Sequence, residues 1–203
     1  MKRIFFTQRV EIIESYGERR DCADQQISAF LRACGFLPIP VPNHAETARS
    51  LWENIKPDGI FLSGGNNLLR YAGDAPERDA TERTLVDRAI EEHVPVFGIC
   101  RGLQFLVDYF GGALEPVENH VRTRHRITGD ISRPSVNSYH TLGAKHLPPP
   151  LVALATAEDG TVEALRHATL PLFAIGWHPE REHPFTAEDI AFVQKIYEQE
   201  DSL

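Results

Sequence analysis

The first half of the chain alternates short apolar runs with amphipathic stretches of helical period. Ile27, Phe30, Leu31 and Cys34 recur at helical spacing, and Gly35 follows where a helix C-cap belongs. The alternation predicts strands at 4–7, 37–41, 59–62 and 94–99 and helices at 27–34, 47–55 and 77–93. Such β-α-β units are typical of an α/β fold, with helices on both faces of a parallel sheet.

After residue 112 the pattern changes to short strand-like runs, which predicts mixed or antiparallel additions to the sheet. These runs lie at 124–127, 135–137, 152–155, 161–165 and 172–175. A last helix at 186–198 begins with Thr186 in the N-cap position. The chain has 203 residues and no internal repeat, so we expect a single domain over 1–203.

Charge and cysteine usage narrow the function classes. The 29 acidic residues outnumber the 21 basic ones, giving a formal charge of -8. We therefore expect no nucleic-acid or anionic-membrane partner, because both need a basic face. Three cysteines cannot all pair, which favours a reducing, cytoplasmic location. The apolar run at the N-terminus is too short for a signal peptide, and no apolar run reaches about 18 residues.

The segment around Cys100 predicts a nucleophile. A continuous apolar run leads into Gly98-Ile99-Cys100-Arg101-Gly102, and a helical pattern follows. This is a nucleophile elbow with cysteine in place of serine. At a helix N-terminus the thiol ionises more readily, and the N–H of Arg101 would face a developing oxyanion. Of the other cysteines, Cys34 lies on an apolar helix face and Cys22 near its start, so both are expected to be structural.

A cysteine nucleophile needs an imidazole base, and the chain offers nine histidines. His178 comes directly after the expected strand 172–175, so it shares with Cys100 the carboxyl edge of the sheet. Glu180, two residues later, is close enough to orient the ring. A surface turn histidine is the alternative interpretation of His178.

Taken together, the stretches 98–104 and 176–180 resemble the class I glutamine amidotransferase superfamily, in its peptidase C26 or γ-glutamyl hydrolase form. The resemblance implies a flavodoxin-like three-layer α/β/α sandwich with a mostly parallel central sheet. It also implies a catalytic triad of Cys100, His178 and Glu180. The family reaction attacks a γ-glutamyl amide, passes through a thioester and releases glutamate without a cofactor.

Smaller matches imply further contacts. Ser63-Gly64-Gly65 resembles the family's glycine-rich oxyanion loop, which would place the N–H of Gly65 beside that of Arg101. In the family, Gly64 and Gln104 match positions that contact the glutamyl group. A mere turn and a solvated helix residue are the alternatives for these two segments.

Two later stretches resemble γ-glutamyl-γ-aminobutyrate hydrolases. The first is Val136-Asn137-Ser138-Tyr139-His140, which in relatives helps to hold the glutamyl α-amino and α-carboxylate groups. It makes Asn137, Ser138 and Tyr139 candidate substrate-binding residues. The second is the Asp-Gly-Thr-Val-Glu-Ala sequence at 159–164.

A closer resemblance is to the γ-glutamyl-CDP-amidate hydrolase group of capsule phosphoramidate pathways. The resembling stretches are 7–9, 15–16, 63–66, 119–121, 136–140 and 178–182. The group releases glutamate and cytidine diphosphoramidate from a nucleotide-linked γ-glutamyl substrate. A glutamine kinase and a cytidylyltransferase are the implied enzymes upstream.

Basic residues offer a site for such a leaving group. Arg122, Arg124 and Arg126 would share one face of a regular strand and could hold a diphosphate. A solvated edge strand explains the same pattern. Arg9 and Arg19 follow the first strand, where either could meet a phosphate or lie in an exposed loop.

Other chemistries are disfavoured. His120, His125, His140 and His146 are scattered without the paired spacing of a zinc signature, so we expect no metal site. No phosphate-binding G-x-x-x-x-G-K-[ST] loop is present. The charged residues at 74–79 are expected to cap a helix rather than to act in catalysis.

Three alternative functions stay open. A γ-glutamyl amine hydrolase, with γ-glutamyl-γ-aminobutyrate as one substrate, would use the same chemistry. A glutaminase component would pass ammonia to a synthetase. A degenerate binding module is disfavoured because Cys100, His178 and Glu180 are all present. The oligomeric state, a homodimer included, is not determined by the sequence.

Overall fold

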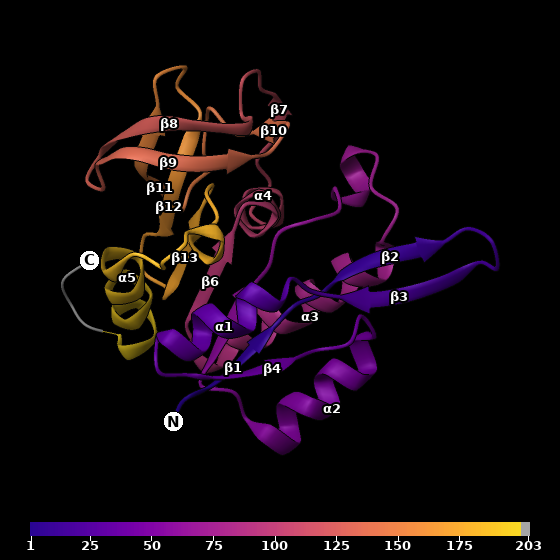
Figure 1. The fold of residues 1–203 in the computed structure, drawn as a ribbon. Coiled ribbons are helices and arrows are strands. Elements are labelled where there is room, and N and C mark those ends of the chain that lie inside the picture. Colours follow the sequence, from indigo (N-terminus) through magenta and orange to yellow (C-terminus); the bar gives the residue numbers. More distant parts are fainter. Residues whose placement is uncertain (200–203) are drawn as a thin grey trace.

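The computed structural model describes residues 1–199 and is built on one sheet in the order β4-β1-β5-β6-β13-β12-β11-β8-β9 (Figure 1). From β4 to β13 all neighbours are parallel, and from β13 to β9 all are antiparallel. The parallel part comprises β4 (Leu37–Pro40), β1 (Arg3–Phe6), β5 (Gly59–Leu62), β6 (Val96–Ile99) and β13 (Leu172–Ile175).

Side chains alternate along the parallel strands between two hydrophobic layers. Ile60 and Leu62 pack with the helices on one face, whereas Phe61 packs on the other. The first face is covered by α2 (Ala45–Ile55), α3 (Pro76–Glu92) and α4 (Arg101–Tyr109). The second is covered by α1 (Gln25–Ala33) and α5 (Ala187–Glu198). The three-layer, flavodoxin-like fold with a mostly parallel central sheet is thereby confirmed.

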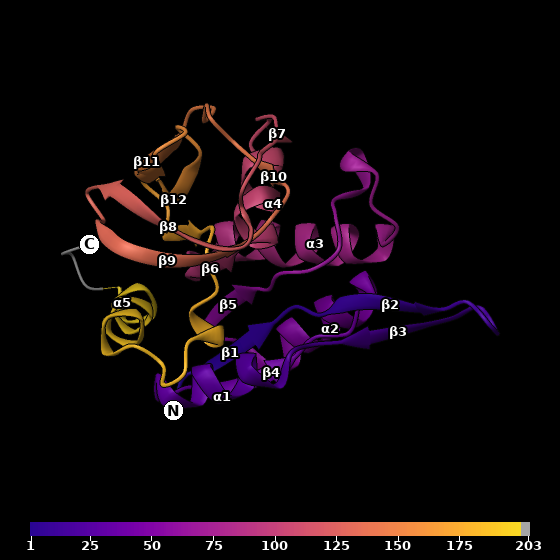
Figure 2. The same ribbon diagram turned by 45° about the horizontal axis from the view of Figure 1, so that its top comes forward.

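The second part of the sheet is antiparallel. It contains β12 (Val162–His167), β11 (Leu151–Ala157), β8 (Val121–Gly129) and β9 (Arg133–Tyr139), and a small sheet of β7 (Glu115–Pro116) and β10 (Leu142–Gly143) lies beside it (Figure 2). The change from parallel to antiparallel pairing after residue 112 agrees with the sequence pattern. The strands are longer than most of the runs that predict them.

The topology brings three loops to one edge of the sheet. β6 pairs in parallel with both β5 and β13, so all three strands end on the same side. The segments that follow them carry Gly64 and Gly65, Cys100, and His178 with the short helix η2 (Pro179–Arg181). The three segments therefore meet at one edge of the sheet, the edge at which the sequence predicts the catalytic residues.

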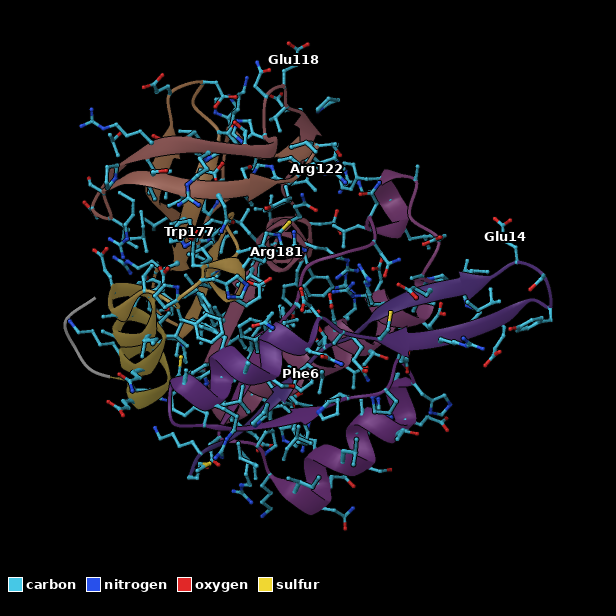
Figure 3. The ribbon with its side chains drawn as sticks, in the orientation of Figure 1. Phe6, Glu14, Glu118, Arg122, Trp177 and Arg181 are labelled. Carbon is cyan, nitrogen blue, oxygen red and sulfur yellow. The ribbon has the colours of Figure 1, made fainter. Side chains whose placement is uncertain are left out.

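One of the two alternatives left open for Arg9 and Arg19, an exposed loop, is wrong. The polar segment from Arg9 to Arg20 is not a loop but the hairpin of β2 (Arg9–Ile13) and β3 (Glu18–Cys22), which projects from the body. The side chain of Glu14 lies at its tip (Figure 3). Because β3 is almost entirely exposed, it lacks the apolar alternation from which a strand is predicted. Within residues 1–199 no helix is long and apolar enough to span a bilayer.

Candidate active site

Cys100 lies in a strained turn between β6 and α4. Its backbone has φ 50° and ψ −101°, a conformation that costs energy for any residue other than glycine. Its N–H donates to the carbonyl of Ile175 at 2.7 Å. A Cβ on Gly98 would lie 2.8 Å from the backbone of Gly102, and one on Gly102 would lie 2.6 Å from the Leu62 carbonyl oxygen. The glycines at both positions are therefore what lets this turn form, as the nucleophile elbow predicted.

His178 lies beside Cys100 and is oriented by Glu180. Its Nδ1 is 2.6 Å from Oε1 of Glu180, and both side chains are buried. Burial alone would lower the pKa of His178, but the negative charges of the Cys100 thiolate and the Glu180 carboxylate raise it to about 9. At neutral pH this favours the protonated, imidazolium form of His178 beside Cys100.

The loop after β5 passes next to this pair. A Cβ on Gly64 would lie 2.8 Å from Cε1 of His178 and 3.6 Å from Cβ of Cys100, so only glycine fits. Gly65 has φ +84°, which also favours glycine. The buried guanidinium of Arg78 donates to the carbonyl oxygens of Ser63, Gly64 and Gly65. These hydrogen bonds turn the three carbonyl groups toward Arg78, so the loop has a fixed conformation before substrate binds.

The charge of Arg78 belongs to a buried network. Glu82 accepts from both Arg78 and Arg101, and Arg101 also pairs with Asp79. Burial would raise the pKa of Glu82, but Arg101 and Arg78 lower it below its usual range. Burial and the charge of Arg101 lower the pKa of Arg78 to about 10, which leaves it protonated at neutral pH. The side chain of Arg101 is thus engaged by two carboxylates. Its backbone N–H is the first of α4 and therefore has no partner within the helix.

A cavity of about 450 Å³ opens beside Cys100. Gln104 lines it, with Nε2 donating to the carbonyl of Leu142 at 2.8 Å. Tyr139 lines it from the other side and meets the ring of His178 edge-on, with 5.5 Å between ring centroids. Other lining residues include Gly65, Asn66, Asp74, His140 and Thr141. The cavity walls are mainly polar, as a binding site for an amino-acid group requires.

Asn137 and Ser138 have other partners than the expected substrate. The amide of Asn137 donates to the His178 carbonyl at 2.8 Å and accepts from the His178 N–H at 2.9 Å. Ser138 is fully buried, and its hydroxyl donates to the carbonyl of His120 at 2.7 Å. Asn137 therefore positions the histidine loop, and of the three predicted contacts only Tyr139 lines the cavity.

Arg19 and Arg9, which the sequence predicts near a phosphate, have different surroundings in the structure. Arg19 is held by two partners, the Glu77 carboxylate at 2.6 Å and the carbonyl oxygen of Asp74 at 2.7 Å. Arg9 lies against Gly65 with its guanidinium half exposed and paired to Glu11. Arg9 also lines a narrow pocket with His178 and Arg181. Arg9 is therefore the predicted arginine that lies beside the histidine loop and is still open to a ligand.

The three arginines of β8 are all exposed, but two bulges break the regular spacing expected of the row. Arg122 has φ 53°, and the pairing with β9 shifts register there and again between His125 and Ile127. These bulges interrupt the alternation on which a shared face depends. Arg124 pairs with Glu182 at 2.9 Å and with Ser135. In Figure 3, Arg122 lies at the start of β8, apart from Arg181.

Comparison with known proteins agrees with this geometry. The family model "glutamine amidotransferase class-I" matches residues 20–196. The chain belongs to this family. The γ-glutamyl-CDP-amidate hydrolase of Campylobacter jejuni is 33% identical over 183 residues, which cover 89% of this chain and 90% of that protein. The γ-glutamyl-γ-aminobutyrate hydrolase of Escherichia coli K12 is 34% identical over 199 residues, with 77% of each chain covered.

The fold of this amidotransferase-family chain is also found in a solved structure. A GMP synthase component from Thermoplasma acidophilum superposes with a TM-score of 0.71 at 20% identity, covering 97% of this chain and 93% of that one. At this identity the likeness concerns the fold alone. It agrees with the family match and with the three-layer arrangement.

The structure corrects the sequence-based expectations for two features of this region. Arg78 is expected to cap a helix, yet it is completely buried and binds the carbonyl oxygens of Ser63, Gly64 and Gly65. The expectation that the histidines are scattered is also wrong, because His120, His125 and His140 converge on Glu163. Burial would raise the pKa of Glu163, but these imidazoles lower it below its usual range. Neither feature has a spacing signal, since the partners are far apart in sequence.

Proposed function

We propose that the protein is a γ-glutamyl amide hydrolase with Cys100 as nucleophile, His178 as acid and base, and Glu180 as its orienting acid. The observation that carries this proposal is the position of Cys100. It occupies a strained elbow next to the His178–Glu180 pair and opens onto a polar cavity of about 450 Å³. This is the arrangement of a nucleophile, a base and an orienting group.

The reaction would run in two steps. The Cys100 thiolate attacks the γ-carbonyl carbon, and the N–H groups of Gly65 and Arg101 stabilise the oxyanion. As the C–N bond breaks, the His178 imidazolium gives its proton to the leaving nitrogen, and a γ-glutamyl thioester forms. His178 then takes a proton from water, the hydroxide attacks the thioester, and glutamate leaves as the Cys100 thiolate returns.

The glutamyl group would occupy the cavity. Asp74 offers a carboxylate for the α-amino group, and Gln104 and Tyr139 offer polar side chains on the other walls. The leaving group must then point past the oxyanion loop. Arg9 and Arg181 lie on that side and line one narrow pocket with Gly65 and His178.

We further propose γ-glutamyl-CDP-amidate as the substrate, with cytidine diphosphoramidate as product. The similarity to the Campylobacter jejuni hydrolase spans nearly the whole of both chains, and the arginines beside His178 suit a diphosphate. In this role the enzyme would act in the cytoplasm, in capsule phosphoramidate synthesis after a glutamine kinase and a cytidylyltransferase. Hydrolysis of γ-glutamyl-γ-aminobutyrate is the second candidate, since hydrolases of that compound are about as identical over a smaller part of the chain.

Glutamate release from three substrates tests the proposal. The purified enzyme and its Cys100→Ala variant are each given γ-glutamyl-CDP-amidate, γ-glutamyl-γ-aminobutyrate and glutamine. A kcat/KM about 1,000-fold higher for the nucleotide, roughly 4 kcal/mol of transition-state discrimination, is the expected result. Preference for the γ-aminobutyrate compound would replace the substrate but keep the chemistry. Release of glutamate from none of the three would overturn the proposal and direct attention to a synthetase partner.

A further inference from the structure

Behind the cavity wall, three histidines surround one carboxylate. His120 precedes β8, His125 lies within it and His140 follows β9, whereas Glu163 is on β12. The nitrogens His120 Nδ1, His125 Nε2 and His140 Nε2 lie 3.2, 3.3 and 3.3 Å from the same oxygen, Oε1 of Glu163. Glu163 is fully buried, and His120 and His140 are 4% and 6% exposed.

These buried atoms lack hydrogen bonds of acceptable geometry. Within residues 1–199, none of the three nitrogens that face Glu163 has a partner, and neither has either oxygen of Glu163. Five such atoms in one cluster contrast with ordinary protein interiors, where nearly all buried polar groups are paired. The cluster therefore needs another component.

The outer ring nitrogens show what that component is. Nδ1 of His140 lies 3.1 Å from the carbonyl oxygen of Leu142, and Nε2 of His120 lies 3.3 Å from Oδ2 of Asp159. The Leu142 carbonyl can only accept, so Nδ1 of His140 carries a proton, whereas Asp159 is a charged neighbour of His120 without a well-aligned hydrogen bond. In a neutral imidazole the inner nitrogen then directs a lone pair at the Glu163 carboxylate. A cation between the nitrogens and the carboxylate would stabilise this arrangement, and an outer nitrogen bonded to a carbonyl or carboxylate oxygen is typical of metal-bound histidines.

The three nitrogen–oxygen distances match the spacing of neighbouring ligands around a small divalent metal. In a tetrahedral site with bonds of about 2.0–2.1 Å, neighbouring ligand atoms lie about 3.3 Å apart. Ligand atoms of His120, His125 and Glu163 all lie within 4.8 Å of one another. We propose that His120, His125 and Glu163 bind a zinc-class divalent ion, with His140 placed to become the fourth ligand. Imidazole and carboxylate ligands suit zinc better than calcium or magnesium.

An ion could reach the histidine cluster from solvent, and the cluster lies next to the candidate active site. A cavity of about 400 Å³ on the outer side, lined by His120, His125 and Asp159, gives an ion access. On the inner side His140 lines the cavity of Cys100. A Cβ on Gly176 would lie 2.1 Å from Oε2 of Glu163, so the carboxylate packs against the chain two residues before His178. A bound metal would brace both the cavity wall and the histidine loop.

Metal content and cobalt spectra test the site on the full chain. The protein is purified without an affinity tag, stripped with a chelator, and titrated with Zn²⁺ or Co²⁺. We expect one equivalent of zinc, a higher Tm with zinc, and cobalt d–d bands without a thiolate charge-transfer band. His125→Asn should weaken zinc binding at least about 100-fold. His146→Asn, at a histidine outside the cluster, is the matched control and should bind as the wild type does.

Three outcomes would overturn the proposal. The first is a wild-type protein that takes up no zinc or cobalt, which would leave the cluster as a set of protonated imidazoles around Glu163. The second is unchanged affinity in His125→Asn. The third is a thiolate band that disappears in Cys100→Ala, which would place the metal at the nucleophile. Glu163→Gln is a second variant for the same titration, and the wild-type spectrum keeps the test valid if that variant does not fold.

Discussion

The parallel and the antiparallel parts of the sheet contribute different things to the active site. β5, β6 and β13 place Gly64, Cys100 and His178 through backbone geometry that leaves no space for other side chains at several positions. β8 and β9 contribute side chains such as Tyr139 and Arg124, which lie at the surface of the cavity or beyond it. In the proposed function the backbone of the parallel part would fix the chemistry, whereas exposed side chains such as Tyr139 and Arg9 would carry substrate preference.

The largest effect should come from removing the nucleophile. We expect Cys100→Ala to lower kcat at least about 10,000-fold, because no other group can form the thioester. Its Tm should stay close to that of the wild type, since alanine fills nearly the same space. Steady-state glutamate release and thermal melts measure both quantities, with Cys22→Ala as the control thiol. Substantial turnover by Cys100→Ala would show that Cys100 is not the nucleophile.

Next in size is the support of the oxyanion loop. Arg78→Met breaks a completely buried ion pair and should lower the free energy of unfolding by about 3–5 kcal/mol. It should also lower kcat more than it raises KM, because the loop carbonyls lose their common donor. Urea unfolding and kinetics measure the two effects, and Arg83→Met, on the exposed side of α3, is the control. Equal behaviour of both variants would contradict the role given to Arg78.

The pH profile should reflect the raised pKa of His178, about 9. Above that pH the imidazolium is lost, so kcat/KM should fall about tenfold per pH unit on the alkaline side. The same shift, from the ordinary 6.5, contributes stability that is complete below pH 6.5 and lost as the pH rises to about 9. In Glu180→Gln the alkaline limb should move to lower pH. An alkaline limb that is unmoved in this variant would disconnect Glu180 from the imidazole.

The smallest effect should concern only the leaving group of the substrate. Arg9 lies outside the catalytic loops, and its guanidinium is half exposed and paired with Glu11. We expect Arg9→Ala to raise KM for γ-glutamyl-CDP-amidate about five- to tenfold and to leave that for glutamine unchanged. Arg49→Ala, an exposed arginine on α2, is the control. An equal change for both substrates would show that Arg9 does not meet the phosphates.

The sequence predicts those features of the fold and the candidate site that depend on local patterns of residues. β5 and β13 are predicted with the observed bounds because they are buried apolar runs between polar loops. Cys100, Gly98 and Gly102 are found because a tight turn imposes local spacing. His178 is a candidate because it follows a strand of the same sheet, and the family resemblance of residues 176–180 singles it out from the surface-turn alternative. Local patterns are sufficient wherever the backbone itself makes the site.

Long-range features leave no such signal. The buried position of Arg78 depends on a loop 13 residues away in sequence, and a charged residue in a helix is normally exposed. The bulge at Arg122 arises from pairing with β9 and not from the residue itself. The members of the histidine cluster lie on or beside three strands that only the sheet brings together. Tertiary contacts, rather than propensity, decide these positions.

The buried guanidinium under the oxyanion loop has a further consequence. Because Arg78 binds three successive carbonyl groups, the intervening peptide planes cannot flip without breaking buried charged hydrogen bonds. The amide dipoles that would receive the oxyanion are thereby preorganised in the free enzyme, and little reorganisation energy is left for the reaction to supply. In the proposed reaction, substrate would therefore meet a loop whose peptide groups already have their final orientation.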